Sequence, residues 1–155
     1  MKKRKKMKLW TKVLIFAALA AVSILLAVYI QIFVIGNTAD VMSIFACNVE
    51  YNTDKIRIIV DQTSSATGIV GCKARKKGDS VYIKIRETLV DGVHQYNGSA
   101  KLELVGDFAD VKNIYLEDGI NKKQIYPHDY GKTIEQTLEE CTWIGGEWET
   151  IEVKD

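Results

Sequence analysis

The sequence predicts an all-β fold: a small antiparallel β-sandwich or barrel-like domain, preceded by one N-terminal transmembrane helix and followed by a short C-terminal helix. Three observations lead to this prediction. Residues 13–35 contain no charged side chain. Six or seven short segments of alternating apolar and polar residues follow, separated by turn-forming residues, as in small antiparallel β-domains. Near the C-terminus the apolar spacing changes to that of a helix.

The apolar run 13–35 is long enough to cross a membrane. Its 23 residues would form a helix of about 34 Å at about 1.5 Å per residue, compared with about 30 Å for a bilayer's hydrocarbon core. A helix satisfies its own backbone hydrogen bonds, as lipid requires. We therefore expect membrane lipid to be the partner of this segment.

The charges beside the run predict its direction. Residues 1–12 carry seven Lys or Arg side chains and no acid, whereas no further Lys or Arg occurs until Lys55. Lys and Arg near a span stay in the cytoplasm, so we expect a single-pass protein of the cell membrane, with a cytoplasmic N-terminus and an extracytoplasmic C-terminal domain. A cleaved signal peptide is the main alternative, although its apolar segment is usually about 7–15 residues. Lipidation at Cys47 is a second alternative.

The rest of the chain is long enough for one small domain. Residues 13–155 carry a net charge of −6, which argues against nucleic acid as a partner. We expect a juxtamembrane stalk over 36–47, a β-domain over 48–127 and a C-terminal extension over 128–155 that packs on the domain.

Period-two alternation predicts the strands. It is clearest over 80–86, where Val81, Ile83 and Ile85 are expected to face the core and Tyr82, Lys84 and Arg86 to face water. Further strands are expected over 49–51, 55–61, 68–75, 100–105, 111–116 and 124–126. The glycines of 68–75 suggest a bulge. Asn97–Gly98 and the segment 117–123 are hairpin signals.

The C-terminal segment changes character after Pro127. Thr133, with Gln136 three residues later, predicts a capping box that opens a short helix ending near Cys141. Residues 143–153 are expected to form either a hairpin around two glycines or a loose tail. Two tryptophans this close rarely both stay exposed, so Trp143 and Trp148 are candidate partner-facing aromatics.

The predicted hairpin over 111–126 contains the sequences IYLEDG (114–119) and KQIY (123–126). With this hairpin, the overall plan resembles the small extracytoplasmic β-domains attached to single membrane helices in Gram-positive bacteria, which are mostly uncharacterised. The resemblance covers residues 50–126. It implies an extracytoplasmic β-domain and assigns no functional residues.

The residue types that carry catalysis or metal binding show no recognised spacing, and we predict no catalytic, cofactor-binding or metal-binding residue. His94 and His128, the only histidines, both fall in expected loops. Cys47, Cys72 and Cys141 lack the spacing of a zinc or redox motif. They leave open one disulfide in any of three pairings, or three thiols.

Two groups of charged residues are candidate binding sites. Lys73, Arg75, Lys76 and Lys77 form a basic cluster that could contact an anionic envelope polymer or lipid. Lysines that protect an edge strand from aggregation would give the same pattern. Four turn acids, Asp107, Asp110, Glu117 and Asp118, could bind calcium weakly, although solvated acids are commoner on turns.

These observations predict a membrane-anchored, extracytoplasmic, non-catalytic interaction module. A protein partner is expected, with the chain acting as an accessory or sensory component of a cell-envelope complex. The alternative is a binding module for an envelope polymer or ion. An enzyme is not expected, because no catalytic constellation is apparent.

Overall fold

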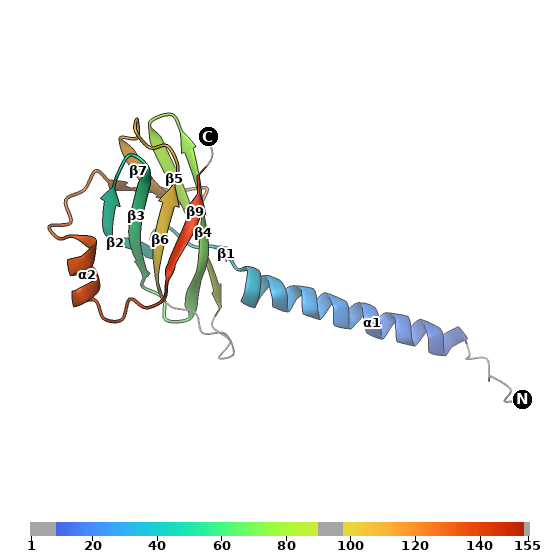
Figure 1. Ribbon diagram of the computed structural model, residues 1–155. Coiled ribbons are helices and arrows are strands. Elements are labelled where there is room, and N and C mark those ends of the chain that lie inside the picture. The colour runs from blue at the N-terminus through green and yellow to red at the C-terminus, as the bar shows by residue number, and fades with distance from the viewer. Residues whose placement is uncertain (1–8, 90–97, 154–155) are drawn as a thin grey trace, which may run out of the picture.

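The computed structural model describes residues 9–89 and 98–153, and it consists of a long helix followed by a β-rich body (Figure 1). Helix α1 spans Leu9–Ile30 and continues as a π-helical turn, η1, over Gln31–Ile35. The segment Leu9–Ile35 is long and apolar enough to cross a membrane, and none of its most apolar stretch is buried. A signal sequence near the N-terminus can meet the same criteria of length and hydropathy.

The body contains two mixed β-sheets. Sheet A is formed by β1 (Asn37–Thr38), β4 (Thr67–Lys77), β5 (Ser80–Leu89), β7 (Asn113–Glu117) and β8 (Lys122–Tyr126). Sheet B is formed by β2 (Ile44–Tyr51), β3 (Lys55–Gln62), β6 (Ser99–Val105) and β9 (Trp148–Glu152). Every strand expected from the alternation has a counterpart here. β2 is longer than expected, and the predicted bulge in β4 lies between Ile69 and Gly71.

The prediction of a purely antiparallel fold is wrong. In sheet A, β4 pairs with one side of β5 along its whole length. On the other side of β5, β7 pairs in parallel with the first half and β1 pairs with the second half. In sheet B the order is β2-β3-β6-β9, and β9 is parallel to β6. Parallel neighbours need long connections; β5 and β7 are joined through β6 of the other sheet, and β6 and β9 through a chain that contains a helix.

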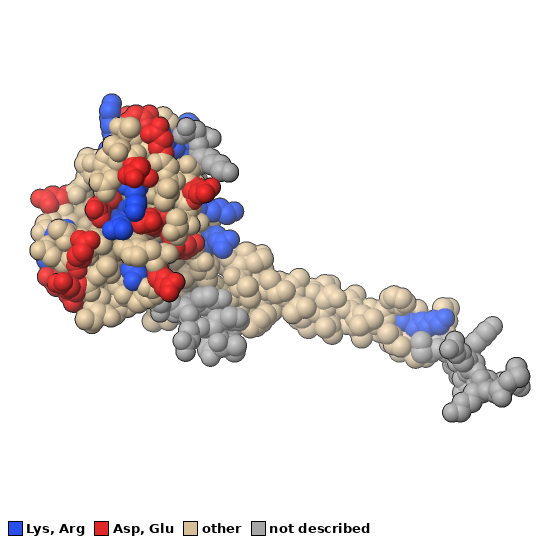
Figure 2. All heavy atoms as spheres, in the orientation of Figure 1, with Lys and Arg blue, Asp and Glu red and all other residues tan. Residues whose placement is uncertain are grey.

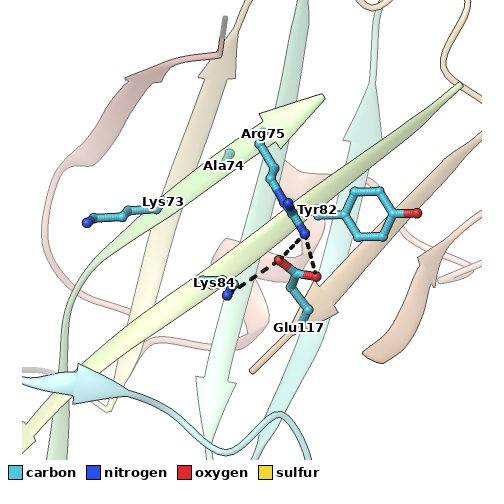
Figure 3. Close-up of a pocket in the computed structure, with 6 residues that line it drawn as sticks. All are labelled: Lys73, Ala74, Arg75, Tyr82, Lys84 and Glu117. Carbon is cyan, nitrogen blue, oxygen red and sulfur yellow. Dashed lines mark hydrogen bonds and ion pairs between the residues drawn. The ribbon is translucent and has the colours of Figure 1, made fainter. Parts of the chain in front are cut away.

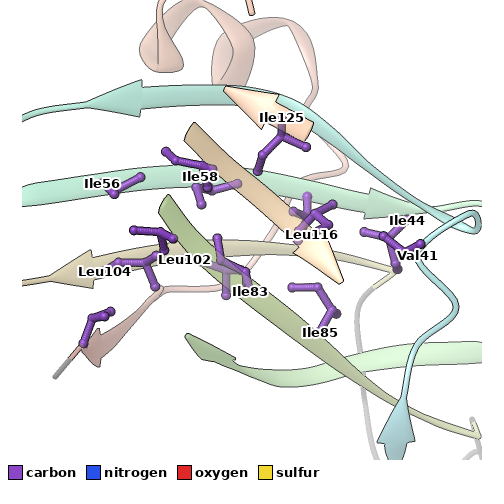
Figure 4. Packing of buried hydrophobic residues seen from close by; sticks show 14 of the residues in the cluster. Val41, Ile44, Ile56, Ile58, Ile83, Ile85, Leu102, Leu104, Leu116 and Ile125 are labelled. Carbon is purple, nitrogen blue, oxygen red and sulfur yellow. The ribbon is translucent and has the colours of Figure 1, made fainter. Parts of the chain in front are cut away.

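The buried apolar residues of the two sheets point toward one another (Figure 4). Val81, Ile83 and Ile85 of β5 are buried, as predicted. They belong to one cluster with residues of sheet B that include Ile58 and Leu102. Along the edges, β4 contacts β9 and β8 contacts β2. The alternation along each strand therefore produces one core between the sheets.

Residues 36–47 differ from the expected stalk, because they lie within the β body. Asn37–Thr38 pairs with β5, and β2 begins at Ile44. Ala39, Val41 and Ile44 are 3%, 2% and 1% exposed. The sequence intervals between these three residues follow no strand or helix period, so the sequence pattern did not predict that they are core residues. The helix α1 is thus followed directly by residues that the core buries.

Asp118, at the β7–β8 turn, connects this entry segment to the hairpin. Its carboxylate accepts hydrogen bonds from the backbone N–H groups of Ile120, Asn121 and Val41. These backbone donors, with Asn121 and Ile120 contributing most, lower the pKa of Asp118 to about 2. The carboxylate therefore closes the turn and holds the entry segment against it.

The C-terminal extension contributes to sheet B. Helix α2 spans Ile134–Glu140, and Thr133 and Gln136 form the predicted capping box. Residues 148–152 form neither the predicted hairpin nor a loose tail but strand β9 at the edge of sheet B. The predicted turn at Asn97–Gly98 falls across the boundary of the described residues, and His94 lies outside them.

Candidate binding site on the outer face of sheet A

The predicted basic cluster is divided between two sides of β4. Lys73, Arg75 and Lys77 are exposed. Lys76 points the other way, its side chain is 10% exposed, and its Nζ lies 2.7 Å from Oδ1 of Asp110. Successive residues of a strand point to opposite faces, so the four cations cannot form one patch.

A surface pocket instead combines two of these cations with residues of neighbouring strands. It has a volume of about 310 Å³ and is lined by Lys73, Ala74, Arg75, Tyr82, Lys84 and Glu117 (Figure 3). The β4–β5 hairpin places Arg75 directly opposite Tyr82, and Lys73 directly opposite Lys84. β7, on the other side of β5, supplies Glu117.

Glu117 is the centre of charge pairing in the pocket. Nη2 of Arg75 lies 3.0 Å and 3.2 Å from its two carboxylate oxygens, and Nζ of Lys84 lies 3.8 Å from Oε1 (Figure 3). The Glu117 side chain is only 11% exposed. Within the described part of the chain, Lys73 has no such ion pair. Three cations facing one carboxylate leave the pocket with an excess of two positive charges.

These pairs leave part of each cation accessible to solvent. The Arg75 side chain is 61% exposed, whereas the Glu117 side chain beneath it is 11% exposed. An incoming anion could therefore reach Arg75 from the solvent side while Glu117 keeps its contacts. Lys73 and Lys84 stand directly opposite each other, and like charges in this position destabilise a sheet. An anionic ligand bound between them would relieve that repulsion.

A row of cationic and aromatic side chains crosses the same face. The Arg75 guanidinium lies 5.4 Å from the ring centre of Tyr82, and the Tyr82 ring stacks on Tyr115 with centroids 5.4 Å apart. Nζ of Lys122 lies 5.0 Å from the Tyr115 ring. The row thus runs across β4, β5, β7 and β8. Aromatic faces of this kind pack against rings or apolar edges of a ligand, while the cations select negative charge.

The sequence prediction missed Tyr82 and Lys84 as site residues, and it considered Glu117 only as a possible calcium ligand. Tyr82 and Lys84 could have been found from the sequence. In a hairpin that turns at residues 78–79, residues at equal distances from the turn are opposite each other, which places Tyr82 opposite Arg75 and Lys84 opposite Lys73. Glu117 carried no such signal, because its position depends on a parallel pairing between strands far apart in sequence.

No family model, curated protein or solved structure matched this chain. The resemblance to Gram-positive extracytoplasmic domains therefore stays a prediction. Inference about function depends on the geometry of the site.

The outer side of sheet B carries mixed charge, as Figure 2 shows in the orientation that places this sheet toward the viewer. There Arg57 and Lys55 both pair with Glu103, at 3.0 Å and 3.4 Å. Hydrogen bonding from Arg57 lowers the pKa of Glu103. Lys55 and Arg57 on this side are thus paired with an acid, in contrast to Lys73 in the pocket on sheet A.

The two predicted aromatics differ in environment. Trp148 is half-buried, and the Arg57 guanidinium carbon lies 5.3 Å from its ring centre. Trp143 is 63% exposed, and its Nε1 donates a hydrogen bond to Oδ2 of Asp61 at 3.3 Å. Only Trp143 presents most of its ring to solvent.

The four turn acids proposed for calcium do not come together. Asp110 and the backbone of Asp107 bind Lys76, Glu117 lines the pocket, and Asp118 closes the β7–β8 turn. Within residues 9–89 and 98–153, no group of three or more His, Cys, Asp or Glu side chains is placed to hold a metal ion.

Two of the three cysteines are poor candidates for nucleophiles. Burial, with a smaller contribution from Glu149, raises the pKa of Cys72 to about 12. Burial also raises the pKa of Cys47 to about 11. Both side chains are therefore almost entirely protonated at neutral pH, whereas the thiolate is the nucleophilic form.

His128, the histidine that the structure describes, is exposed, and its ring packs edge-on against Tyr130.

Proposed function

We propose that the protein is a membrane-anchored, extracytoplasmic, non-catalytic binding module, and that the outer face of sheet A binds an anionic polymer of the cell envelope. One observation carries the proposal: the pocket of Lys73, Arg75 and Lys84 has excess positive charge beside a stacked tyrosine pair. The cations would bind phosphate or carboxylate groups, and the tyrosines would pack against the rings or carbon chain between those groups.

The scaffold supports this role. We infer that the two sheets together form a β-sandwich with a barrel-like closure, since β4 contacts β9 and β8 contacts β2. Such a body presents the face of sheet A rigidly. The charge asymmetry beside the apolar helix favours an uncleaved anchor with its N-terminus in the cytoplasm.

The junction between anchor and body is short. The Thr88 hydroxyl donates a hydrogen bond to the carbonyl of Ile32 in η1, and β1 begins two residues after η1 ends. The body would therefore lie close to the membrane surface, where it could contact polymers that are themselves attached to lipid.

A protein partner is the second candidate, with the chain acting as an accessory or sensory component of an envelope complex. Trp143 is 63% exposed, and Ile120, at the tip of the β7–β8 turn, is 94% exposed. Exposed aromatic and apolar side chains are typical anchors of protein interfaces. Capture by the intact chain that is lost in the Trp143→Ala and Ile120→Ser double variant would favour this candidate.

We expect charge reversal in the pocket to abolish polymer binding. The full chain in detergent should bind poly(glycerol phosphate) but not a neutral glucan of similar length. Binding should weaken as salt rises, since exposed charges are screened. The Lys73→Glu, Arg75→Glu and Lys84→Glu triple variant should lose at least about tenfold in affinity, measured by titration calorimetry.

The matched control reverses three cations on the side of sheet B: Lys55, Lys101 and Lys132. This variant has the same net charge but keeps the pocket, so its affinity should stay close to that of the wild type. Equal loss in both variants would show attraction to overall charge alone. No binding by the wild type, or full binding by the pocket variant, would reject the proposed site.

We expect the body to be accessible from outside the cell. Protease added to intact cells should remove residues beyond the apolar helix and leave a short membrane-bound fragment that retains the basic tail. The expected orientation follows from the seven cations in residues 1–12. Protection of the body while a surface marker is digested would reject the orientation, and a mature N-terminus beyond residue 36 would show a cleaved signal peptide.

A further inference from the structure

A β-bulge places both Cys47 and Asn48 on the side of β2 that faces helix α2. In the pairing of β2 with β3, Ala46 is opposite Val60 and Asn48 is opposite Ile59, so Cys47 is the extra residue. A bulge of this kind interrupts the alternation of side chains. Ala46 packs on the main core between the sheets, whereas Cys47 packs in a second cluster outside it.

Asn48, the next residue, fixes α2 over this position. It is 3% exposed, and its Nδ2 donates hydrogen bonds to the Lys132 carbonyl at 2.9 Å and to Oγ1 of Thr137 at 2.7 Å. Cys141 is the C-cap of α2, and its N–H donates to the Thr137 carbonyl at 2.9 Å. The contacts of Thr137 therefore connect the bulge on β2 with the end of the helix that carries Cys141.

The second cluster contains the side chains of two of the three cysteines. Ile59, Ile134 and Ile144 form its buried centre, and Cys47 and Cys141 both pack against that centre. The two thiols also interact electrostatically: after burial and Asp61, Cys141 is the next cause that raises the pKa of Cys47. All three cysteines of the chain are unbonded in the structure.

Cys72 is separated from this pair. It lies on β4 in sheet A, packs against the main core and interacts with Glu149 and Arg86. The structure thus distinguishes the three pairings that the sequence left open, because only one pair of cysteines shares a cluster.

We propose that Cys47 and Cys141 are an oxidation site, where they form a disulfide that ties β2 to the C-terminal end of α2 and leaves Cys72 as a thiol. The oxidant is a small disulfide such as oxidised glutathione. One cysteine thiolate attacks it, releases one thiol and forms a mixed disulfide. The second cysteine thiolate then attacks the protein sulfur of that bond and releases the second thiol. Two protein thiols are oxidised, and one small disulfide is reduced to two thiols.

The bond would add a covalent attachment between β2 and the C-terminal end of α2. It would close a loop of about 95 residues, and a disulfide across so long a loop restricts the unfolded chain strongly. We expect the oxidised protein to have a Tm higher by about 10 °C or more than the reduced protein. The inference does not depend on the ligand of the sheet A pocket.

Thiol counting and peptide mapping test the proposal on the full chain in detergent. The chain is incubated with oxidised glutathione at about pH 9, because the raised pKa of Cys47 makes exchange slow at neutral pH. Free thiols should fall from three to one, and mapping should recover a linked peptide pair containing Cys47 and Cys141. Cys72 should be recovered as an alkylated thiol after denaturation.

Variants provide the matched controls. Cys72→Ala should still form the disulfide and gain the same increase in Tm, whereas Cys47→Ala and Cys141→Ala should show no increase. A linked peptide that contains Cys72, only intermolecular linkage, or three persistent thiols in the wild type would overturn the proposal. Mapping of the wild type decides the question even if a variant fails to fold.

Discussion

Replacing Ile83 by Ala is expected to lower the free energy of unfolding of the β body by about 2–5 kcal/mol, the usual cost of removing a buried isoleucine side chain. Ile83 is fully buried in the centre of β5, between the two sheets (Figure 4). The loss combines the transfer free energy of the removed groups with the cavity that they leave. Urea titration followed by circular dichroism measures the change.

The adjacent residue provides the control. Lys84 lies on the same strand but faces the pocket, and its only ion pair in the described part of the chain, with Glu117, is 3.8 Å long. Lys84→Ala should change the free energy of unfolding by no more than about 0.5 kcal/mol. If the two variants lost similar stability, the assignment of inward and outward faces on β5 would be wrong.

Replacing Gly36 by Ala is expected to disrupt the junction between the apolar helix and the body. Gly36 has a φ of 73° and a ψ of 177°, a conformation almost restricted to glycine. A Cβ atom there would lie 2.3 Å from the backbone oxygen of Glu87. Strain and overlap together should cost about 3 kcal/mol or more, and the chain can relieve them by separating β1 from β5.

Hydrogen exchange measures this effect locally. The N–H of Ala39 donates to the carbonyl of Ile85 at 2.9 Å, so it reports on whether the entry segment is attached. A cost of about 3 kcal/mol corresponds to roughly 100-fold faster exchange of this amide.

Gly78→Ala is the matched control for conformational strain. Gly78 also has a positive φ, 60°, but no atom lies within 4 Å of the position that a Cβ would occupy. Its cost should therefore be about 1–2 kcal/mol, without faster exchange at Ala39. Equal exchange at Ala39 in wild type and the Gly36 variant would show that the junction is not held as described.

The candidate site shows how far sequence patterns reach. The alternation over β4 and β5 predicts which side chains share a face, and the turn at residues 78–79 fixes which of them are opposite each other. From these rules Arg75 can be placed beside Tyr82. Glu117 cannot be placed in this way, since it joins the pocket only because β7 pairs in parallel with β5.

Local sequence patterns are sufficient to predict the features that depend on neighbouring residues: the apolar helix, the strands with strict alternation and the capping box of α2. The strand directions, the inclusion of residues 36–47 and β9 in the body, and the separation of Lys76 from the other cations became visible only in the folded structure. Propensity, period and capping act over a few residues, whereas sheet partners and burial are set by contacts between segments far apart in the chain, which no local pattern records.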